Sequence, residues 1–300
     1  MLLDNIRLFL LIVEKGSLAA AAREAGLSAT TVSERLAALE AHFGAILLNR
    51  TTRAISITEE GRLLVEQAPS VLDEVEELEN RIRFGAEHLS GTIRLSVPSD
   101  LGRHIITRAL DNFISDHPDI SIELHLSDGY VDIVGQRMDL AVRFGTLLDS
   151  TLRVRQVKPT RRVICASPDY IARYGEPLQP SDLKRHNCLL MRFGNTLDNI
   201  WELGDGTTKQ VVTVSGNRVA NDGAIVRQWA LAGHGIVWKA DLDVAEDIIQ
   251  GRLVELLPDF AAPPAPLQLL FPPGRTQPRR VKMLAERLAA ALGEARLSSA

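Results

Sequence analysis

Side chains that form specific hydrogen bonds gather in one short segment, between positions 28 and 35. The segment offers hydroxyl groups, one carboxylate and one guanidinium, which between them donate and accept hydrogen bonds. The candidates for such contacts are Thr30, Thr31, Ser33, Glu34 and Arg35. Alanines surround them, so another molecule can approach the polar groups closely. This chemistry is the recognition of a polar surface, and it needs no covalent step.

The spacing around this segment predicts two helices joined by a tight turn. Ser17 can cap a first helix over Leu18 to Ala25, where alanine, the best helix former, dominates. Gly26 ends that helix, and Ser28 caps the next one. The second helix has one apolar face that we expect to be buried, made of Val32, Leu36, Leu39 and Phe43.

With Val32 facing the core and about 3.6 residues per turn, the opposite face of the second helix carries Thr30, Glu34, Ala37 and Ala41. A face of small side chains with polar groups near its N-terminal end fits the floor of a DNA major groove. The segment from 18 to 40 is therefore predicted to be a helix-turn-helix. The alternative is an ordinary helical hairpin, whose exposed face more often carries long Lys and Glu side chains.

Residues on either side of this motif complete a small domain. A first helix is expected over Asp4 to Glu14, and short strands at Leu47-Leu48 and Ile55 to Ile57 predict a β-wing. Arg50 and Arg53 lie at the tip of the wing, where guanidinium groups suit phosphate oxygens or a minor groove. Solvated turn arginines are the alternative interpretation.

Composition is typical of a globular protein, and 300 residues suffice for two or three compact units. No apolar run approaches the roughly 18 residues of a membrane span, and the acid near the N-terminus is atypical of a signal peptide, so we expect a cytoplasmic location. The net charge of −4 argues against a protein that coats nucleic acid. Residues 1–62 hold seven basic and seven acidic side chains, so DNA binding there must depend on their placement. Cys165 and Cys188 are expected to be reduced buried thiols, with a redox switch as the alternative.

A long helix is predicted from Thr58-Glu59-Glu60, which places carboxylates in the first turn, to about Phe84. Pro69 interrupts it, and we expect a kink there. Apolar residues alternate by four and three, the heptad spacing of paired helices, at Leu64, Ala68, Val71, Val75, Leu78 and Ile82. We therefore expect this helix to pair with another chain, the alternative being a helix that lies on its own domain. Its surface has a net charge of −5 over residues 63–90, which excludes a basic DNA-binding region.

After a hinge near residues 85–91, strand-like and helix-like runs alternate, which predicts βα units and mostly parallel sheets. The expected strands are 93–97, 120–126, 140–143, 163–166, 211–214, 236–238 and 267–271. The expected helices are 103–117, 130–137, 222–232 and 278–292. The length of this half favours two α/β lobes, with the chain crossing between them near Thr160 and Ala265.

Polar residues follow two of the predicted strands, Ser99 and Asp100 after one, and Asn221 and Asp222 after the other. Ligands gather at the carboxyl ends of parallel strands, where helix N-termini present free N–H groups. These junctions are candidates for facing walls of a ligand cleft between the lobes, although all four residues can instead be simple helix caps. Further candidates for the cleft wall are Asp128, Arg143 and Phe144.

Sequence motifs for catalysis or cofactor binding are absent. The seven histidines and two cysteines show no metal-binding spacing, and no nucleophile elbow, P-loop or dinucleotide fingerprint occurs. We therefore predict no catalytic residue, no metal site and no cofactor, and a protein that is not an enzyme.

The residues named so far resemble the signature of the LysR-type transcriptional regulators, and the resemblance covers nearly the whole chain. Its first part is a series at fixed spacing: Phe9-Leu10, Val13-Glu14, Gly16-Ser17, Ala20-Ala21-Ala22, Leu27-Ser28, Val32-Ser33, Leu39-Glu40, Gly44, Leu47, Arg50-Thr51, Arg53 and Thr58-Glu59-Glu60-Gly61. Weaker matches follow at Asp116-His117-Pro118, Asp139-Leu140-Ala141, Cys165-Ala166-Ser167-Pro168 and Gly233-His234-Gly235-Ile236.

The resemblance implies a winged helix-turn-helix at 1–58, a dimerising linker helix and hinge at 59–90, and an effector domain at 91–300 like the type 2 periplasmic binding proteins. Lobe I of that domain would be 91–160 with 266–300, and lobe II would be 161–265. The implied partners are a dyad operator in double-stranded DNA, a small-molecule co-inducer between the lobes, further copies of the chain in a dimer or tetramer, and RNA polymerase, with no membrane. Carried over by position, Thr30, Thr31, Ser33 and Arg35 would meet the operator, together with Arg53 from the wing.

Two positions depart from the family pattern. Glu34 stands where the family often has a basic or amide residue, and it would accept a hydrogen bond from cytosine. Trp238-Lys239 replaces a common leucine-proline pair in the ligand-side wall. A solute-binding protein or small-molecule enzyme built on the two lobes leaves the first 90 residues unexplained, and an oligomerisation scaffold leaves the polar strand ends without a role.

Overall fold

The computed structural model describes residues 1–50, 55–85, 88–129, 132–145, 151–204, 209–260, 262–273 and 277–295, without the side chains of Arg50 and Arg81. The chain divides into two compact units, Met1–Glu87 and His88–Ala300. Each unit is described by itself. None of the helices within the described ranges is both long and apolar enough to span a lipid bilayer.

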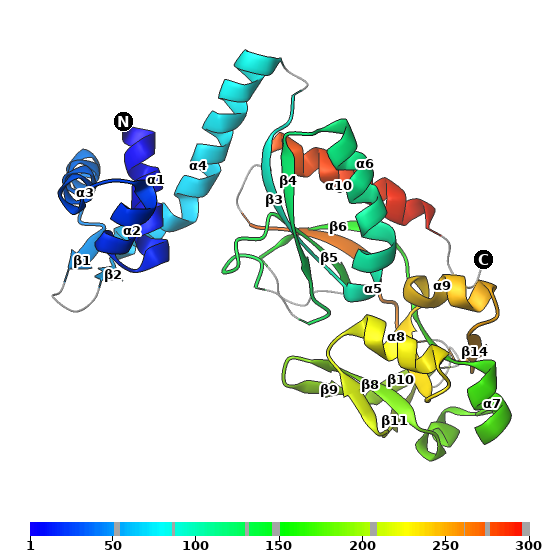
Figure 1. Ribbon diagram of the computed structural model, residues 1–300. Coiled ribbons are helices and arrows are strands. Elements are labelled where there is room, and N and C mark those ends of the chain that lie inside the picture. Colours follow the sequence, from blue (N-terminus) through cyan, green and yellow to red (C-terminus); the bar gives the residue numbers. More distant parts are fainter. Residues whose placement is uncertain are drawn as a thin grey trace. The chain divides into compact units, whose positions relative to one another are not determined.

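The first unit is a helix-turn-helix with a two-stranded wing (Figure 1). Its elements are α1 (Leu2–Lys15), α2 (Leu18–Ala25), α3 (Ala29–Phe43), β1 (Leu48–Arg50), β2 (Ile55–Ile57) and α4 (Glu59–Phe84), with β1 and β2 antiparallel. The predicted caps of α2 and α3 are confirmed, because Ser17 Oγ accepts from Ala20 N and Ser28 Oγ accepts from Thr31 N. Gly26 ends α2 with φ 64°, a left-handed conformation that glycine adopts without a Cβ clash.

The core of the first unit contains Val32, Leu36 and Leu39 from α3, as predicted. Phe43 was expected on the same buried face, but it is 46% exposed, so that expectation is wrong for this residue. Phe43 is the last residue of α3 before Gly44 turns the chain, and no apolar element among the described residues of this unit covers it fully.

The long helix α4 spans Glu59–Phe84 as predicted, with Pro69 inside it. Its N-terminal half belongs to the core of its own unit, where Leu64, Ala68 and Leu72 pack. The first two positions of the predicted heptad therefore serve intramolecular packing. The later positions Val71, Leu78 and Ile82 are 50%, 56% and 76% exposed, respectively.

The described part of the second unit contains two large sheets and one separate hairpin. The first has the order β4-β3-β5-β15-β6, in which β3 pairs in parallel with β4 and β5, and β15 pairs antiparallel with β5 and β6. Its strands are β3 (Gly91–Val97), β4 (Ile120–Leu126), β5 (Leu140–Phe144), β6 (Arg153–Lys158) and β15 (Leu267–Phe271). Figure 1 shows α6 (Thr107–Asp116) and α10 (Arg279–Glu294) packed together on one face of this sheet. We refer to this sheet and its helices as lobe I.

The second sheet has the order β12-β8-β13-β7-β14, with β9 paired to β8. Its strands are β7 (Arg162–Ala166), β8 (Cys188–Phe193), β9 (Thr196–Asp198), β12 (Arg218–Ala220), β13 (Ile236–Ala240) and β14 (Val254–Leu256). Its helical segments are α7 (Pro168–Tyr174), η2 (Pro180–Arg185), α8 (Gly223–Leu231) and α9 (Asp241–Ile249). A separate hairpin is formed by β10 (Ile200–Gly204) and β11 (Lys209–Thr213). We refer to these elements as lobe II.

Two segments of chain connect the lobes side by side. Ala265 N donates to Thr160 O at 2.9 Å, the Thr160 hydroxyl donates to Ala265 O, and Arg161 forms a bridge with Pro264. A double connection of this kind allows the lobes to move about one axis while each keeps its own core.

Some local predictions in the second unit are wrong. A helix was expected over 130–137, but residues 133–137 form turns, and Tyr130 and Val131 lie outside the described residues. The run 211–214 was expected in a βα unit, yet most of it belongs to the antiparallel hairpin strand β11. By contrast, the helix expected over 103–117 is confirmed: α5 (Ser99–Leu101), the π-helical segment η1 (Gly102–Ile106) and α6 follow one another without a break and end at Asp116.

Candidate nucleic-acid interface and ligand cleft

The outer face of α3 has the character predicted for a surface that approaches DNA. Thr30, Glu34, Ala37 and Ala41 are all exposed, and Val32 on the opposite side is fully buried. Thr31, Ser33 and Arg35 flank this face and are half-buried. Small side chains beside one carboxylate leave the helix backbone accessible, which suits insertion into a groove about 12 Å wide.

One of the predicted contact residues already has an intramolecular role. Ser28 Oγ lies 2.8 Å from Thr31 Oγ1 and also accepts from Thr31 N at 3.0 Å, so the two hydroxyls close the first turn of α3. Thr30 and Glu34 have no such contact among the described residues. They are therefore the freest polar groups on the exposed face.

Contacts from α3 and α4 hold the start of the wing in place. Glu40 Oε1 accepts from Leu47 N at 2.9 Å and from Leu48 N at 3.3 Å, which ties the end of α3 to the start of the wing. A Cβ on Gly61 would lie 2.1 Å from Leu47 O, so only glycine fits where α4 passes this strand. Arg50 ends β1, but its side chain and the whole of Arg53 lie outside the described residues.

A cleft of about 300 Å³ lies between lobes I and II. Lobe I contributes Pro98, Asp128, Arg143 and Phe144, and lobe II contributes Met191, Phe193, Trp238, Lys239 and Asp243. Three predicted wall residues, Asp128, Arg143 and Phe144, thus meet there. An apolar lining with a few charged groups is typical of small-molecule sites.

Arg143 is the cationic group of the cleft that has no carboxylate partner within salt-bridge distance among the described residues. Its guanidinium donates instead to Val142 O at 2.6 Å and to Ser96 Oγ at 2.7 Å. Burial lowers the pKa of Arg143 to about 10, because desolvation disfavours the charged form. The guanidinium still carries its charge at neutral pH, so this part of the cleft favours an anion.

Beside it, the carboxylate of Asp128 bridges the lobes. It accepts from Ser99 N at 3.0 Å and from the Ser99 hydroxyl in lobe I, and from Gly223 N at 2.7 Å in lobe II. Ser99 begins α5 and Gly223 begins α8, so Asp128 satisfies N–H groups at two helix starts.

A buried ion cluster adjoins these helix starts. The Lys239 ammonium contacts Asp100 of lobe I and lies 3.0 Å from Asp243 Oδ2 of lobe II, and all three side chains are at most 7% exposed. Burial alone would lower the pKa of Lys239, yet Asp243 and Asp100 hold it above its ordinary value. Burial raises the pKa of Asp243 to about 6 despite the neighbouring ammonium.

The remaining predicted residues lie apart from the cleft wall. Ser99 and Asp100 are only 3% and 2% exposed and are bonded within the protein. Asp222 caps α8 and forms a two-pronged pair with Arg103 across the lobes, at 3.2 and 3.0 Å. Burial alone would raise the pKa of Asp222, but the hydrogen bond from Arg103 holds it below its ordinary value. Asn221 is exposed.

Sequence reasoning missed part of the cleft chemistry. Asp243 was not singled out, because it lies in α9, a helix whose start has no side-chain cap. Arg103 was not expected to cross to the other lobe. Trp238-Lys239 was recognised as a departure from the family pattern, and Lys239 is the centre of the ion cluster.

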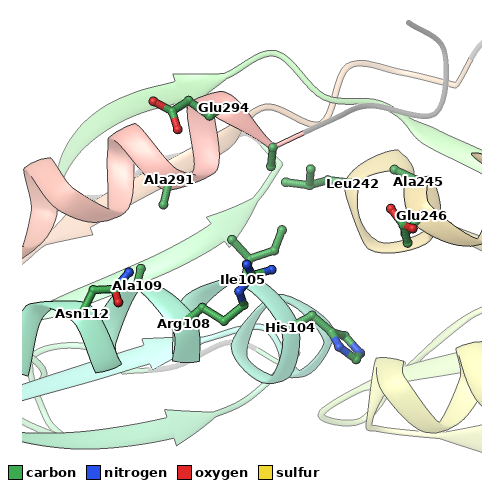
Figure 2. Close-up of a pocket in the computed structure, with 11 residues that line it drawn as sticks. His104, Ile105, Arg108, Ala109, Asn112, Leu242, Ala245, Glu246, Ala291 and Glu294 are labelled. Atoms are coloured by element: carbon green, nitrogen blue, oxygen red, sulfur yellow. The ribbon is translucent and has the colours of Figure 1, made fainter.

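A second and larger hollow, of about 770 Å³, lies among η1, α6, α9 and α10. Figure 2 shows Leu242 directed into it from α9, with His104 and Arg108 on one side and Glu246 and Glu294 on others. These four polar side chains are exposed, in contrast to the buried groups of the cleft. Across the described ranges, no group of three or more His, Cys, Asp or Glu side chains is arranged to hold a metal ion.

Comparison with known proteins identifies both units. A family model described as a bacterial regulatory helix-turn-helix protein of the lysR family matches residues 3–62, and a LysR substrate binding domain matches residues 86–293. The HTH-type transcriptional regulator DmlR of Escherichia coli K12 is 33% identical over 262 residues, which cover 87% of this chain and 85% of that protein. The HTH-type transcriptional activator TtdR of the same strain is 32% identical over 260 residues, covering 87% of this chain and 84% of that protein. The structure of CrgA, a LysR-type transcriptional regulator from Neisseria meningitidis, superposes with a TM-score of 0.63 at 29% identity, covering 97% of this chain and 99% of that one.

Proposed function

Because the chain is a member of the LysR family of DNA-binding transcriptional regulators, we propose that α3 reads a dyad operator in double-stranded DNA. The observation that carries this proposal is the exposed face of α3, with Thr30 and Glu34 among alanines. Base contacts come from Thr30, Thr31, Ser33, Glu34 and Arg35. Arg50 and Arg53 of the wing contact the sugar-phosphate backbone or the minor groove.

Two copies of the chain associate through α4. The support is the row of exposed apolar residues Val71, Leu78 and Ile82, which belong to the predicted heptad and are not covered by any described residue of their own unit. A twofold dimer presents two recognition helices to two half-sites, and pairs of dimers form tetramers. The regulator acts on DNA in the cytoplasm, makes contact with RNA polymerase and has no catalytic activity of its own.

The cleft between the lobes binds a small organic anion with an apolar body. Arg143 supports an acid group, since its charge is buried and lacks a carboxylate partner within the described part of the chain. Phe144, Met191 and Trp238 supply apolar walls, and a cleft of about 300 Å³ limits the ligand to a small molecule.

Ligand binding changes DNA geometry by shifting a population. The double connection at Thr160 and Ala265 permits the lobes to adopt more than one arrangement, and the paired DNA-binding domains adopt different spacings with them. The ligand contributes only its difference in affinity between those arrangements.

Footprinting of the full-length protein on DNA from upstream of its own gene tests this function. We expect two protected half-sites about one helical turn apart, or multiples of that distance, and a shifted pattern of protection when an active acid is added. Protection without half-sites, or at random positions, would contradict operator recognition.

Calorimetric titration tests the ligand class separately. A small aromatic or branched carboxylate is compared with its neutral amide, using the protein without DNA. Replacing Arg143 with glutamine should weaken binding of the acid by about tenfold to a hundredfold, the value of a charge-assisted hydrogen bond. Arg155→Gln on the exposed face of β6 is the matched control and should leave binding unchanged.

A further inference from the structure

The carboxylate of Asp128 accepts several converging hydrogen bonds, as the acid group of a bound ligand would. Three donors converge on it: the Ser99 amide, the Ser99 hydroxyl and the Gly223 amide. Two of these donors belong to lobe I and one to lobe II, while Asp128 itself follows β4 of lobe I. One side chain therefore closes a contact between lobes whose cores are separate except for Leu242 of α9, which packs in the core of lobe I.

The geometry around Gly223 is built for this approach. A Cβ at that position would lie 2.5 Å from Lys239 Nζ and 3.4 Å from Asp128 Oδ2, so a side chain there would push apart the groups that meet at the amide. The amides at the starts of α5 and α8 have no partner within their helices, and a carboxylate is the group they bind best. In this protein the Asp128 carboxylate already occupies the position in front of the Ser99 and Gly223 amides.

We propose that Asp128 is an intramolecular ligand, a positioning residue that occupies the anion position formed by Ser99 and Gly223 and thereby holds the lobes together. It also determines specificity, because an incoming acid group is excluded from the helix starts and is directed to Arg143. This second role rests on the ligand site proposed above, whereas the first stands without it.

The surrounding charges agree with an anion held at this point. The hydrogen bond with Asp222 is the main cause that raises the pKa of Arg103, and Asp128 adds a smaller contribution. Asp128 also partly offsets the burial that lowers the pKa of Arg143. Lys239 is neutralised separately by Asp100 and Asp243, so it does not require Asp128 as a partner. The carboxylate is therefore held chiefly by hydrogen bonds from the two helix starts.

Removal of the Asp128 carboxylate should create a binding site for a free one. The experiment uses the full-length Asp128→Ala variant without DNA, and acetate as the probe. Thermal unfolding is followed by tryptophan fluorescence, since the three tryptophans, Trp201, Trp229 and Trp238, all lie in lobe II. We expect Tm to fall by about 5 °C from the lost hydrogen bonds. Acetate at about 100 mM should then restore more than half of that loss, whereas chloride at equal ionic strength should not.

Three further variants locate the effect. Asp132→Ala removes a carboxylate that accepts from Gly135 N within an exposed turn, so it is a matched control whose acetate-dependent gain in Tm should be no larger than that of the native protein. The double variant Asp128→Ala, Arg143→Gln should retain the gain, because the proposed acetate site needs no group from Arg143. In the Arg143→Gln background with Asp128 intact, acetate should have no effect.

Each other outcome counts against the proposal. Absence of an acetate effect on Asp128→Ala, or an equal effect on Asp132→Ala, would overturn it. Loss of the effect in the double variant would assign acetate to Arg143 and overturn the claim about the helix starts. If the alanine variant does not fold in any buffer, Asp128→Asn keeps the side-chain volume, and a Tm equal to that of the native protein would overturn the proposal. None of these measurements involves DNA or an effector, so a failure of operator binding is distinguishable from a failure here.

Discussion

Replacement of Lys239 by methionine would test how the buried ion cluster holds the two lobes. Methionine keeps most of the length and apolar stem of lysine but removes the ammonium. The lost contacts are those to Asp100 in lobe I and to Asp243 in lobe II, whose side chains are 1% and 6% exposed. Two buried carboxylates would remain without a cation between them.

The loss of stability expected for Lys239→Met follows from the burial of these two carboxylates. Breaking a buried ion pair by removing one partner typically lowers the free energy of unfolding by about 3–5 kcal/mol, since the remaining charge stays desolvated. The cost should depend on pH. In the native protein, Asp243 already has a pKa of about 6, above its ordinary value of 3.8, so its contribution to stability is present at low pH and is lost as pH rises from about 4 to 6.

Without the ammonium the pKa of Asp243 should rise further, and each additional pKa unit corresponds to about 1.4 kcal/mol. Protonation at pH 5 would relieve the unpaired charge, whereas at pH 8 the charge would remain. We therefore expect Lys239→Met to be destabilising by about 4 kcal/mol at pH 8 and by at least about 1.5 kcal/mol less at pH 5.

Urea unfolding of the full-length protein, followed by tryptophan fluorescence at the two pH values, measures both numbers. Lys209→Met is the matched control, because Lys209 pairs with Glu202 at 2.7 Å with side chains 64% and 40% exposed, where a salt bridge contributes about 0–1 kcal/mol. A cost for Lys239→Met as small as that of the control, or one that is equal at pH 5 and pH 8, would refute the reasoning.

Three further predictions concern DNA reading, association and the thiols. Glu34→Ala should relax the preference for one base pair by about 1–3 kcal/mol in competition binding with operator variants, and an equal loss on every sequence would contradict a base contact. Leu78→Glu should separate the paired chains, since Leu78 is 56% exposed on α4, and a variant that still sediments as a dimer would exclude this seam. Burial raises the pKa of Cys165, and it raises that of Cys188 to about 12, so both thiols should react with Ellman's reagent only after unfolding, and fast reaction in the native protein would contradict this.

The elements that the sequence predicted well have local signals. The starts and ends of α2 and α3 follow from Ser17, Gly26 and Ser28, each acting within one turn of its own helix. Strand β6 has no such signal, because its run Arg153–Lys158 carries charges at an edge and pairs with β15 more than 100 residues later. The false helix near 130–137 shows the reverse error, since the Asp132 side chain closes a turn with Gly135 N and Arg137 has a φ of 54°.

The candidate site could be predicted only in part, because some of its contacts also have no local signal in the sequence. Strand ends pointed to Asp128 and Arg143, because ligand sites follow strands in α/β folds. Nothing local to Asp100 shows that it is paired with Lys239, 139 residues away, and the pair depends on how the two lobes meet. A residue that follows a strand can thus be a ligand contact or an internal partner, and tertiary packing decides which.

Operator recognition by α3 is best measured as binding to DNA from upstream of the protein's own gene, compared with binding to scrambled DNA of equal length across a range of salt concentrations. We expect a preference of about 10³ or more for the upstream sequence, with affinity that falls as salt rises because phosphate contacts release counterions. Equal affinity for the two DNAs at every salt concentration, with and without small organic acids, would contradict operator recognition by α3.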